Sequence, residues 1–395
     1  MPTFYNYTEG GQVYSFDDVF VPAEAFRQGT LFTWGSNDDP FEGNGFLGTN
    51  DSTNRRTPVT TFAGGTNWKQ VATGSFHTAA IKTDGTLWTW GVNYSGQLGV
   101  DGSSSQIPIT TFNGGTNWKQ VSCGVKHTAA IKTDGTLWTW GRNAYGELGI
   151  NTPTQINTPV TTFTGGTNWK QVACGYDHTI AVKTDGTLWT WGNNSSGQLG
   201  NNTTTTRSTP VTTFAGGTNW KQVAAKASYT FYNAAIKNDG TLWTWGDNSN
   251  GQLGDNTTTQ RLTPVTTFAG GTNWKQVACG SGHSAAIKTD GTLWTWGYNY
   301  GSLGDNTTTQ RLTPVTTFAG GTNWKQVAAG SGHCAAIKTD GTLWTWGANN
   351  GAGQLGINNT STRLTPVTTF AGGTNWKQVA CVSHTAATTY IDSYQ

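Results

Sequence analysis

The sequence predicts an all-β fold, a seven-bladed β-propeller of four-stranded antiparallel blades, from three repeated markers. The string TNW occurs seven times, and its successive tryptophans lie 50 to 54 residues apart. The string TWG also occurs seven times, and so does a proline in PVTTF or PITTF. Four short strands repeated seven times are typical of a propeller, in which each repeat forms one blade.

One unit of the repeat contains four predicted strands. WKQVAT at Trp68–Thr73 and HTAAIK at His77–Lys82 form the first two. An Asp84–Gly85 turn follows, because Asp-Gly is a strong hairpin signal. TLWTWG at Thr86–Gly91 forms the third strand, and PITTF at Pro108–Phe112 forms the fourth. A proline at the start of that strand fits an outer edge, where a missing N–H is tolerated.

The two ends of the repeat region predict closure of the ring. The first unit begins in its third strand, at Gly29–Gly35, and the last ends after its second strand, at His384–Tyr390. Two half blades make one whole blade, so the strands from both termini are expected to pair. Closure removes the exposed sheet edges that favour aggregation. Residues 29–395 are therefore expected to form the propeller, after a non-repeated segment at residues 1–28.

Composition excludes several classes of protein. The net charge is +2, which predicts no nucleic-acid binding. No run of 18 apolar residues and no secretory leader occurs, so neither membrane insertion nor export is expected. Five cysteines are too few, and odd in number, for a disulfide scaffold.

The repeat resembles the regulator of chromosome condensation repeat family. The shared pattern is WG-x-N-x-x-GQLG, which stands here as WGVNYSGQLG at Trp90–Gly99, WGRNAYGELG at Trp140–Gly149 and WGNNSSGQLG at Trp191–Gly200. The resemblance covers Gly29–Tyr390 and implies a seven-bladed propeller closed by strands from both termini. The family includes a nucleotide-exchange factor, an ultraviolet photoreceptor and a β-lactamase inhibitor. The exchange factor's particular loop and the photoreceptor's GWRHT are not found here.

Residues 1–28 are acidic and aromatic, with four acids against Arg27. They resemble the leaders of propeller proteins encoded by tailed bacteriophages of cyanobacteria. We expect them to dock onto a larger assembly through Tyr5, Tyr7, Tyr14, Phe16, Asp17, Asp18 and Phe20.

Histidine and cysteine each recur at one position of the repeat. The six histidines all begin the second strand, and Tyr232 takes the seventh position after a three-residue insertion. We expect each histidine to bond backbone at the strand start rather than to bind a metal. Four cysteines share one position with Thr73, Ala225 and Ala329, which predicts a small buried site. No catalytic group, metal site or cofactor site is predicted.

The most variable residues follow the TWG string and are the predicted partner-binding residues. They are Tyr94, Arg142, Tyr145, Asp247, Tyr298 and Tyr300. Tyrosine among Asn, Ser and Gly is typical of adaptable binding surfaces. The recurring arginines before the fourth strand, such as Arg261 and Arg311, either dock a partner or are solvated. The tryptophans lie in predicted strands, which favours core packing over sugar stacking.

These observations favour a non-enzymatic, virion-associated structural protein of a tail, baseplate or fibre. Its partners would be other virion subunits and a host surface receptor or glycan. The alternatives are a soluble cytoplasmic regulator that binds one protein, and a carbohydrate-binding propeller.

Overall fold

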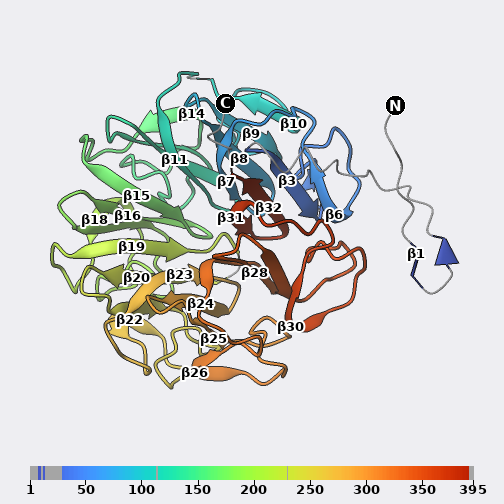
Figure 1. The fold of residues 1–395 in the computed structure, drawn as a ribbon. Helices are drawn as coiled ribbons and strands as arrows, with labels where there is room; N and C mark the ends of the chain where they lie inside the picture. Colours follow the sequence, from blue (N-terminus) through green and yellow to red (C-terminus); the bar gives the residue numbers. More distant parts are fainter. Residues whose placement is uncertain (1–7, 10–11, 14–28, 113, 229, 391–395) are drawn as a thin grey trace.

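Seven four-stranded antiparallel sheets close into a ring in the computed structural model (Figure 1). The structure describes residues 8–9, 12–13, 29–112, 114–228 and 230–390. The predicted seven-bladed propeller is confirmed. Two short hairpins accompany the blades, β1 (Thr8–Glu9) with β2 (Gln12–Val13) and β4 (Asp38–Asp39) with β5 (Gly43–Asn44). Among the described residues no helix could span a membrane.

Each blade runs from an inner strand near the axis to an outer strand at the rim. Blade 1 contains β7 (Trp68–Thr73), β8 (His77–Lys82), β9 (Leu87–Gly91) and β10 (Ser105–Thr110). The inner strands of blades 2 to 6 are β11 (Trp118–Cys123), β15 (Trp169–Cys174), β19 (Trp220–Ala225), β23 (Trp274–Cys279) and β27 (Trp324–Ala329). Their second strands are β12 (His127–Lys132), β16 (His178–Lys183), β20 (Tyr232–Lys237), β24 (His283–Lys288) and β28 (His333–Lys338).

The third strands of blades 2 to 6 are β13 (Leu137–Gly141), β17 (Leu188–Gly192), β21 (Leu242–Gly246), β25 (Leu293–Gly297) and β29 (Leu343–Gly347). Their outer strands are β14 (Ile156–Thr161), β18 (Arg207–Thr212), β22 (Arg261–Thr266), β26 (Arg311–Thr316) and β30 (Arg363–Thr368). In blade 1 the outer strand begins three residues before Pro108, the predicted start. The strand includes the proline because it is an edge strand whose register shifts between Ser105 and Ile109.

The turn between β8 and β9 is the predicted Asp-Gly hairpin. The Asp84 carboxylate accepts hydrogen bonds from the Thr86 amide, at 2.9 Å, and the Thr86 hydroxyl, at 2.7 Å. Gly85 has a φ of +80°, and a Cβ at this position would collide with the Thr116 carbonyl oxygen of the next blade. Glycine is therefore required both for the turn and for the close approach of blade 2.

Blade 7 combines the two ends of the repeat region, as predicted. Its strand order is β31 (Trp376–Cys381), β32 (His384–Thr389), β3 (Leu31–Gly35) and β6 (Arg55–Thr60). Leu31 lies opposite Thr388, and Gly35 lies opposite His384. The C-terminal strand β32 is thus hydrogen-bonded on both sides, and the ring depends on it for closure.

A glutamine in each inner strand joins neighbouring blades. The Gln70 side chain donates to the Val121 carbonyl oxygen at 3.2 Å and accepts from the Val121 amide at 3.1 Å. The same paired contact crosses the closing joint, where Gln378 bonds both backbone groups of Val71 at 2.9 Å. Each amide side chain therefore satisfies backbone groups that the diverging inner strands leave unpaired.

Tryptophans fill the spaces between the blades. Trp118 and Trp140 are about 1% and 0% exposed, and their rings meet edge to face at 6.1 Å. The Trp140 indole also donates to the Gln97 carbonyl oxygen of blade 1 at 3.0 Å. Trp138 lies on the same side of its strand but is only half-buried, and the Lys132 ammonium covers its ring. The prediction of core packing is therefore confirmed fully for the two buried tryptophans of each blade and partly for the half-buried one, which blade 7 replaces with Phe32.

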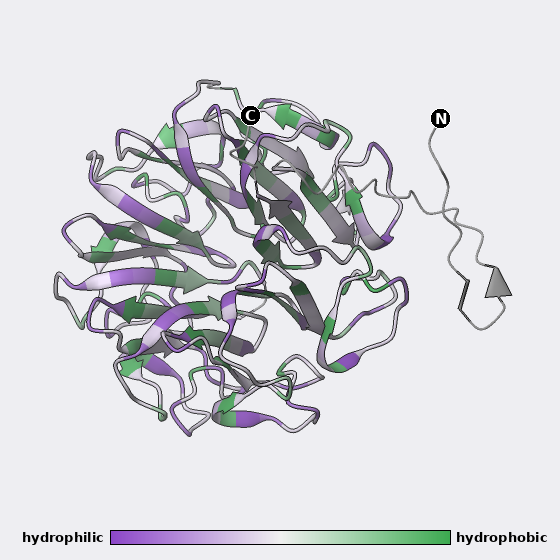
Figure 2. Cartoon of the chain, in the orientation of Figure 1, coloured by the Kyte–Doolittle hydropathy of each residue, from purple (hydrophilic) through white to green (hydrophobic). Residues whose placement is uncertain are grey.

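The ring has two unlike faces. The variable face carries the loop after the first strand, residues 74–76 in blade 1, and the first part of the loop after the third strand, residues 92–104. The later part of that loop runs back along the blade, where Gly99 meets the Phe112 amide. The repeat face carries the Asp-Gly turns and the loops that lead to the next blade, residues 83–86 and 111–117 in blade 1. Loops on the repeat face read TTF-x-GGTN in all seven units, whereas the loops after TWG differ in every blade but keep a common frame. Hydropathy alternates along the blades, and purple hydrophilic segments are common in the outer loops (Figure 2).

Candidate functional site

The predicted binding residues all lie on the variable face, in loops that follow a third strand. Of the tyrosines that the structure describes, Tyr94 and Tyr300 are the most exposed, at 69% and 60%, and Tyr298 and Tyr145 follow at 48% and 40%. Because every blade places this loop at the end of its third strand, side chains from distant repeats share one surface.

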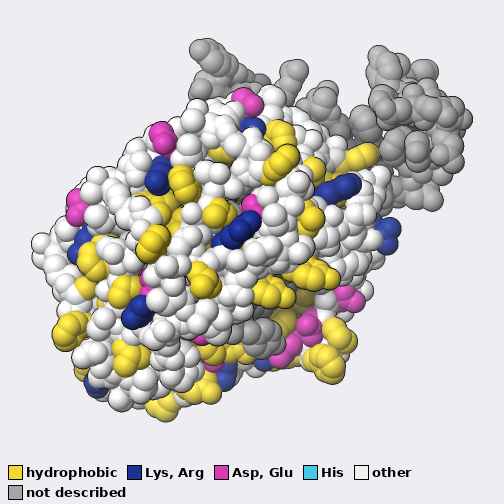
Figure 3. Space-filling model, turned by 90° about the horizontal axis from the view of Figure 1, so that it is seen from below, with side chains coloured by type: hydrophobic (Ala, Val, Ile, Leu, Met, Phe, Trp, Pro, Cys, Tyr) yellow, Lys and Arg dark blue, Asp and Glu magenta, His cyan; other side chains and the backbone are white. Residues whose placement is uncertain are grey.

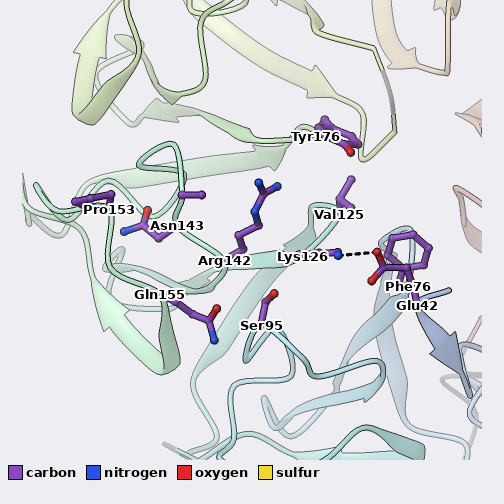
Figure 4. Close-up of a pocket in the computed structure, with 11 residues that line it drawn as sticks. Glu42, Phe76, Ser95, Val125, Lys126, Arg142, Asn143, Pro153, Gln155 and Tyr176 are labelled. Carbon is purple, nitrogen blue, oxygen red and sulfur yellow. Dashed lines mark hydrogen bonds and ion pairs between the residues drawn. The ribbon is translucent and has the colours of Figure 1, made fainter.

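A pocket of about 480 Å³ lies on this face, where loops of blades 1, 2 and 3 meet the loop that holds β5. It is lined by Glu42, Phe76, Ser95, Val125, Lys126, Arg142, Asn143, Ala144, Pro153, Gln155 and Tyr176. In Figure 4, the Arg142 side chain extends between the loops of neighbouring blades, and Lys126 reaches Glu42. Tyr94 lines an adjoining pocket, which shares Gln155 with this one. The structure thus gathers Tyr94, Arg142 and Tyr145 in one region.

Ion pairs hold both cations of the pocket. Arg142 contacts Asp177 at 2.6 Å, and Lys126 contacts Glu42 at 2.7 Å. Burial raises the pKa of Asp177, and the Arg142 guanidinium opposes this shift. The guanidinium also lies 5.3 Å from the centre of the Tyr145 ring. Asp177, Lys126 and Glu42 were not among the predicted binding residues, because they meet their partners only through folding.

Glu147 lies in the same loop as Tyr145 and stands where four of the other six blades carry glutamine. Its side chain is fully buried, one carboxylate oxygen accepts from the Tyr145 amide at 2.7 Å, and the other has no partner. Burial raises the pKa of Glu147 to about 7. The ionised form is therefore disfavoured in the folded protein.

Replacing Glu147 by glutamine is expected to stabilise the protein above about pH 7 and to leave it unchanged below about pH 4.5. The raised pKa means that folding loses free energy as the pH rises from the unfolded value of 4.5 to about 7. The gain approaches about 3.5 kcal/mol well above pH 7, because the shift is about 2.5 pKa units and one unit is worth about 1.4 kcal/mol. Denaturant unfolding over this pH range measures it. Gln198→Glu is the reverse control and should introduce the same pH dependence; equal pH profiles for all three proteins would contradict the assignment.

The loop after the first strand of blade 4 places Lys226 and Ala227 against residues of other blades around the axis. Lys226, which stands where five other blades carry glycine, is buried and donates to the carbonyl oxygens of Ala329 and Cys381. Burial lowers the pKa of Lys226 to about 8. Ser75 of blade 1 donates to the Ala227 carbonyl oxygen across the axis at 2.5 Å. The sequence marked the insertion but not Lys226, because the partners of Lys226 come from blades 6 and 7.

The histidines link neighbouring blades instead of bonding backbone, so that expectation was wrong. The His77 ring contacts the Thr128 hydroxyl at 2.9 Å, and the His384 ring contacts the Thr78 hydroxyl at 2.7 Å across the closing joint. Thr128 in turn donates to the Gln97 carbonyl oxygen, so it accepts from the histidine. Burial lowers the pKa of His77 to about 3, which keeps it neutral. Among the described residues, no three His, Cys, Asp or Glu side chains are placed to hold a metal.

The recurring cysteines occupy small buried positions, as predicted. Cys123, Cys174, Cys279 and Cys381 are at most 4% exposed. Burial raises the pKa of Cys174 and of Cys279 to about 12. A thiol with so high a pKa is a poor nucleophile, because the reactive species is the thiolate.

The remaining predicted residues are not all free. Asp247 accepts from the Ser249 amide at 3.0 Å and the Gln252 side chain at 2.8 Å, so it shapes its own loop. Tyr298 and Tyr300 stay exposed on blade 5. Arg261 and Arg311 pair with nearby aspartates, at 2.7 and 2.9 Å, which explains two of the recurring arginines structurally. The predicted docking residues Tyr5, Tyr7, Tyr14, Phe16, Asp17, Asp18 and Phe20 lie outside the described residues.

Seven repeat-encoded sheets, a closing blade shared by both termini and a face of diversified loops define a repeat-built β-propeller. The chain belongs to the RCC1-like domain family, whose model matches residues 23–232 and 170–392. The predicted family resemblance is confirmed. The match carries no information on a phage origin, which stays a prediction.

Solved structures show the same fold. Human WBSCR16 superposes with a TM-score of 0.80 at 24% identity, over 93% of this chain and all of that chain. Prp20p from Saccharomyces cerevisiae gives a TM-score of 0.77 at 20% identity, over 93% of this chain and 92% of that one. At these identities the similarity concerns the fold.

Curated relatives match parts of the ring. The ultraviolet-B receptor UVR8 of Arabidopsis thaliana is 39% identical over 137 residues, 34% of this chain and 30% of the receptor. The human E3 ubiquitin-protein ligase HERC2 is 30% identical over 274 residues, 66% of this chain and 5% of the ligase. The matched segment spans less than a third of either relative.

Proposed function

We propose that this ring is a non-enzymatic protein-interaction scaffold that binds its partner on the variable face. The observation that carries the proposal is the confinement of most sequence variation between repeats to that face. A ring built from near-identical units would otherwise show scattered differences. Diversified loops on a rigid scaffold are a common way to build a binding surface.

The chemistry of the pocket supports protein binding. Arg142 and Lys126 keep about a quarter to a third of their side chains exposed while paired, so they can share a partner's acidic or carbonyl groups. Tyr94 and Tyr145 offer flat rings beside them, and rings of this kind anchor many interfaces. The histidines and cysteines described above are committed to contacts between blades, which supports a role in binding rather than catalysis.

Relatives support the same class of function. One solved structure describes the binding of Prp20p to Gsp1p and histones, and another shows Kap60 bound to yeast RCC1. Those partners belong to those proteins. They show that this fold serves protein binding elsewhere.

The finer proposal is a virion-associated protein that is held in a tail, baseplate or fibre by residues 1–28. It rests on the acidic, aromatic composition of that segment and its resemblance to phage leaders. The alternative location is the cytoplasm, where the ring would regulate one partner. In both cases the variable face would recognise the partner.

Affinity purification of the tagged chain from its native source tests whether the variable face binds a protein partner. Tyr94→Ala with Tyr145→Ala should reduce recovery of a stoichiometric protein partner by about tenfold, because exposed aromatic anchors dominate interface energies. Phe112→Ala, on the repeat face, is the matched control and should retain the partner. Equal recovery with all three proteins would contradict binding on the variable face.

Deletion of residues 1–28 tests whether this segment holds the protein in a virion. The truncated ring should keep the partner of the variable face and disappear from purified virions. Normal incorporation of the truncated chain would refute the docking role. A wild-type chain found only in cytosol would favour the regulator.

A further inference from the structure

Seven phenylalanines stand exposed on the repeat face, one at the end of each outer strand. Their exposed fractions lie between 55% and 69%, for Phe62, Phe112, Phe163, Phe214, Phe268, Phe318 and Phe370. A large apolar side chain exposed once needs no explanation, but the same exposure in all seven blades does. The described contacts bury none of these rings.

One backbone contact fixes every phenylalanine in the same way. The Phe112 amide donates to the Gly99 carbonyl oxygen at 2.9 Å, and the Phe62 and Phe370 amides make the equivalent bond to Gly48 and Gly356 at 2.7 and 2.8 Å. The other four blades repeat it. Because the blades are equivalent around the axis, the seven rings stand at a common level.

The repeat face is also strongly basic. Each inner strand carries a lysine as its second residue, and these seven are Lys69, Lys119, Lys170, Lys221, Lys275, Lys325 and Lys377. Six more end the second strands of blades 1 to 6, and among the described residues the acids on this face are the six aspartates of the Asp-Gly turns. Thirteen lysines against six aspartates leave a surplus of seven positive charges. The chain's net charge of +2 conceals this surplus.

The lysines of the repeat face are not neutralised by ion pairs. The five ion pairs among the described residues involve side chains of the variable face and its outer loops, such as Arg142 with Asp177. Lys132 and its equivalents lie over tryptophan rings, as at 4.3 Å from Trp138, which orders the stem without removing the charge. The face therefore presents a net positive field to whatever approaches it.

We propose that the repeat face is a peripheral docking surface for an anionic lipid membrane. The level ring of phenylalanines would enter the headgroup region, and the lysines would meet lipid phosphates and carboxylates. This combination of aromatic and cationic side chains is the one that interfacial proteins use. Contact would be peripheral, with the ring lying on the surface rather than crossing it.

The geometry favours a lipid surface over other anionic partners. Seven equivalent and separated rings fit a continuous plane, in which every position accepts an apolar group. Figure 3 shows the molecule from the side, with hydrophobic side chains scattered in small groups among Lys and Arg; the residues of the repeat face are those named above. A second copy of this face is disfavoured because both copies carry the same charge. A nucleic acid or an acidic protein would use the lysines but would not require phenylalanine at every blade.

Vesicle co-sedimentation of the full chain tests the proposal. Binding should be at least about tenfold stronger to vesicles with about 30% phosphatidylserine than to phosphatidylcholine alone, and about 0.5 M salt should reduce it strongly. Phe112→Ala, Phe163→Ala and Phe214→Ala together should weaken binding by about tenfold or more, and leucine at the same positions should restore most of it. Lys119→Glu, Lys170→Glu and Lys221→Glu together should abolish the preference for phosphatidylserine.

Tyr94→Ala with Tyr145→Ala, on the opposite face, is the matched control and should bind vesicles as the wild type does. Thermal unfolding of each variant checks that the ring is intact. The three substituted phenylalanines and the three substituted lysines are all exposed, so we expect the ring to fold. Equal binding to both vesicle types, or undiminished binding by the folded phenylalanine variant, would overturn the proposal. Salt-sensitive binding to DNA or polyglutamate that depends on the lysines alone, without vesicle binding, would assign the face to those partners instead.

Discussion

Deleting His384–Gln395 is expected to destabilise the whole ring by at least about 5 kcal/mol, far beyond an ordinary terminal truncation. The deletion removes β32, which is hydrogen-bonded to β31 on one side and β3 on the other. Phe32 and Trp376, now buried against each other, would be exposed. Both remaining strands would present open edges, which favour pairing between molecules.

Calorimetry and size-exclusion chromatography measure the effect of this deletion. The truncated chain should lose the single cooperative transition of the closed ring and should form oligomers. Deletion of residues 391–395 alone is the matched control, because it leaves β32 in place. An unchanged melting temperature after the longer deletion would show that closure does not stabilise the ring.

Trp140→Ala is expected to cost about 3–5 kcal/mol, the range for removing a fully buried aromatic side chain. The substitution removes the edge-to-face contact with Trp118 and the hydrogen bond to Gln97. It also leaves a cavity at the boundary between blades 1 and 2. Because the blades share one closed ring, the loss should appear in global unfolding rather than as local fraying.

Trp138→Ala provides the matched control two residues away. Its indole is half-buried, and it bonds only the Thr136 hydroxyl of its own turn, at 2.9 Å. We expect a cost of about 1–2 kcal/mol, in proportion to the smaller area buried. Denaturant unfolding of both variants measures the difference. Similar losses for the two would mean that the packing between blades does not distinguish them.

The proposed function places protein binding on the variable face, and the further inference places lipid binding on the repeat face. Substitutions on the variable face should affect a protein partner, and substitutions on the repeat face should affect lipid binding. Each set therefore serves as the control for the other. A variant set that altered both activities would point to a loss of the ring itself.

The candidate residues were predicted less completely than the fold. Tyr94, Arg142 and Tyr145 were identified because they vary where the repeat is otherwise constant. Lys126 and Glu42 escaped notice because they are 84 residues apart and meet only when blade 2 faces the β4–β5 hairpin. The histidine partners were misjudged because each ring bonds a side chain of the next blade, about one repeat away in the sequence.

The sequence by itself determined the number of blades, the strands of each unit and the pairing of the two ends. Those features follow from local signals, since periodic spacing, alternation and Asp-Gly turns act over a few residues and recur seven times. Only the tertiary structure decided which side chains from different blades meet. It placed Lys226 across the axis, brought Arg142 to Asp177 and separated a basic, phenylalanine-ringed face from a diversified one. These contacts depend on closure of the ring, because closure brings residues of different repeats, which are far apart in the sequence, next to one another.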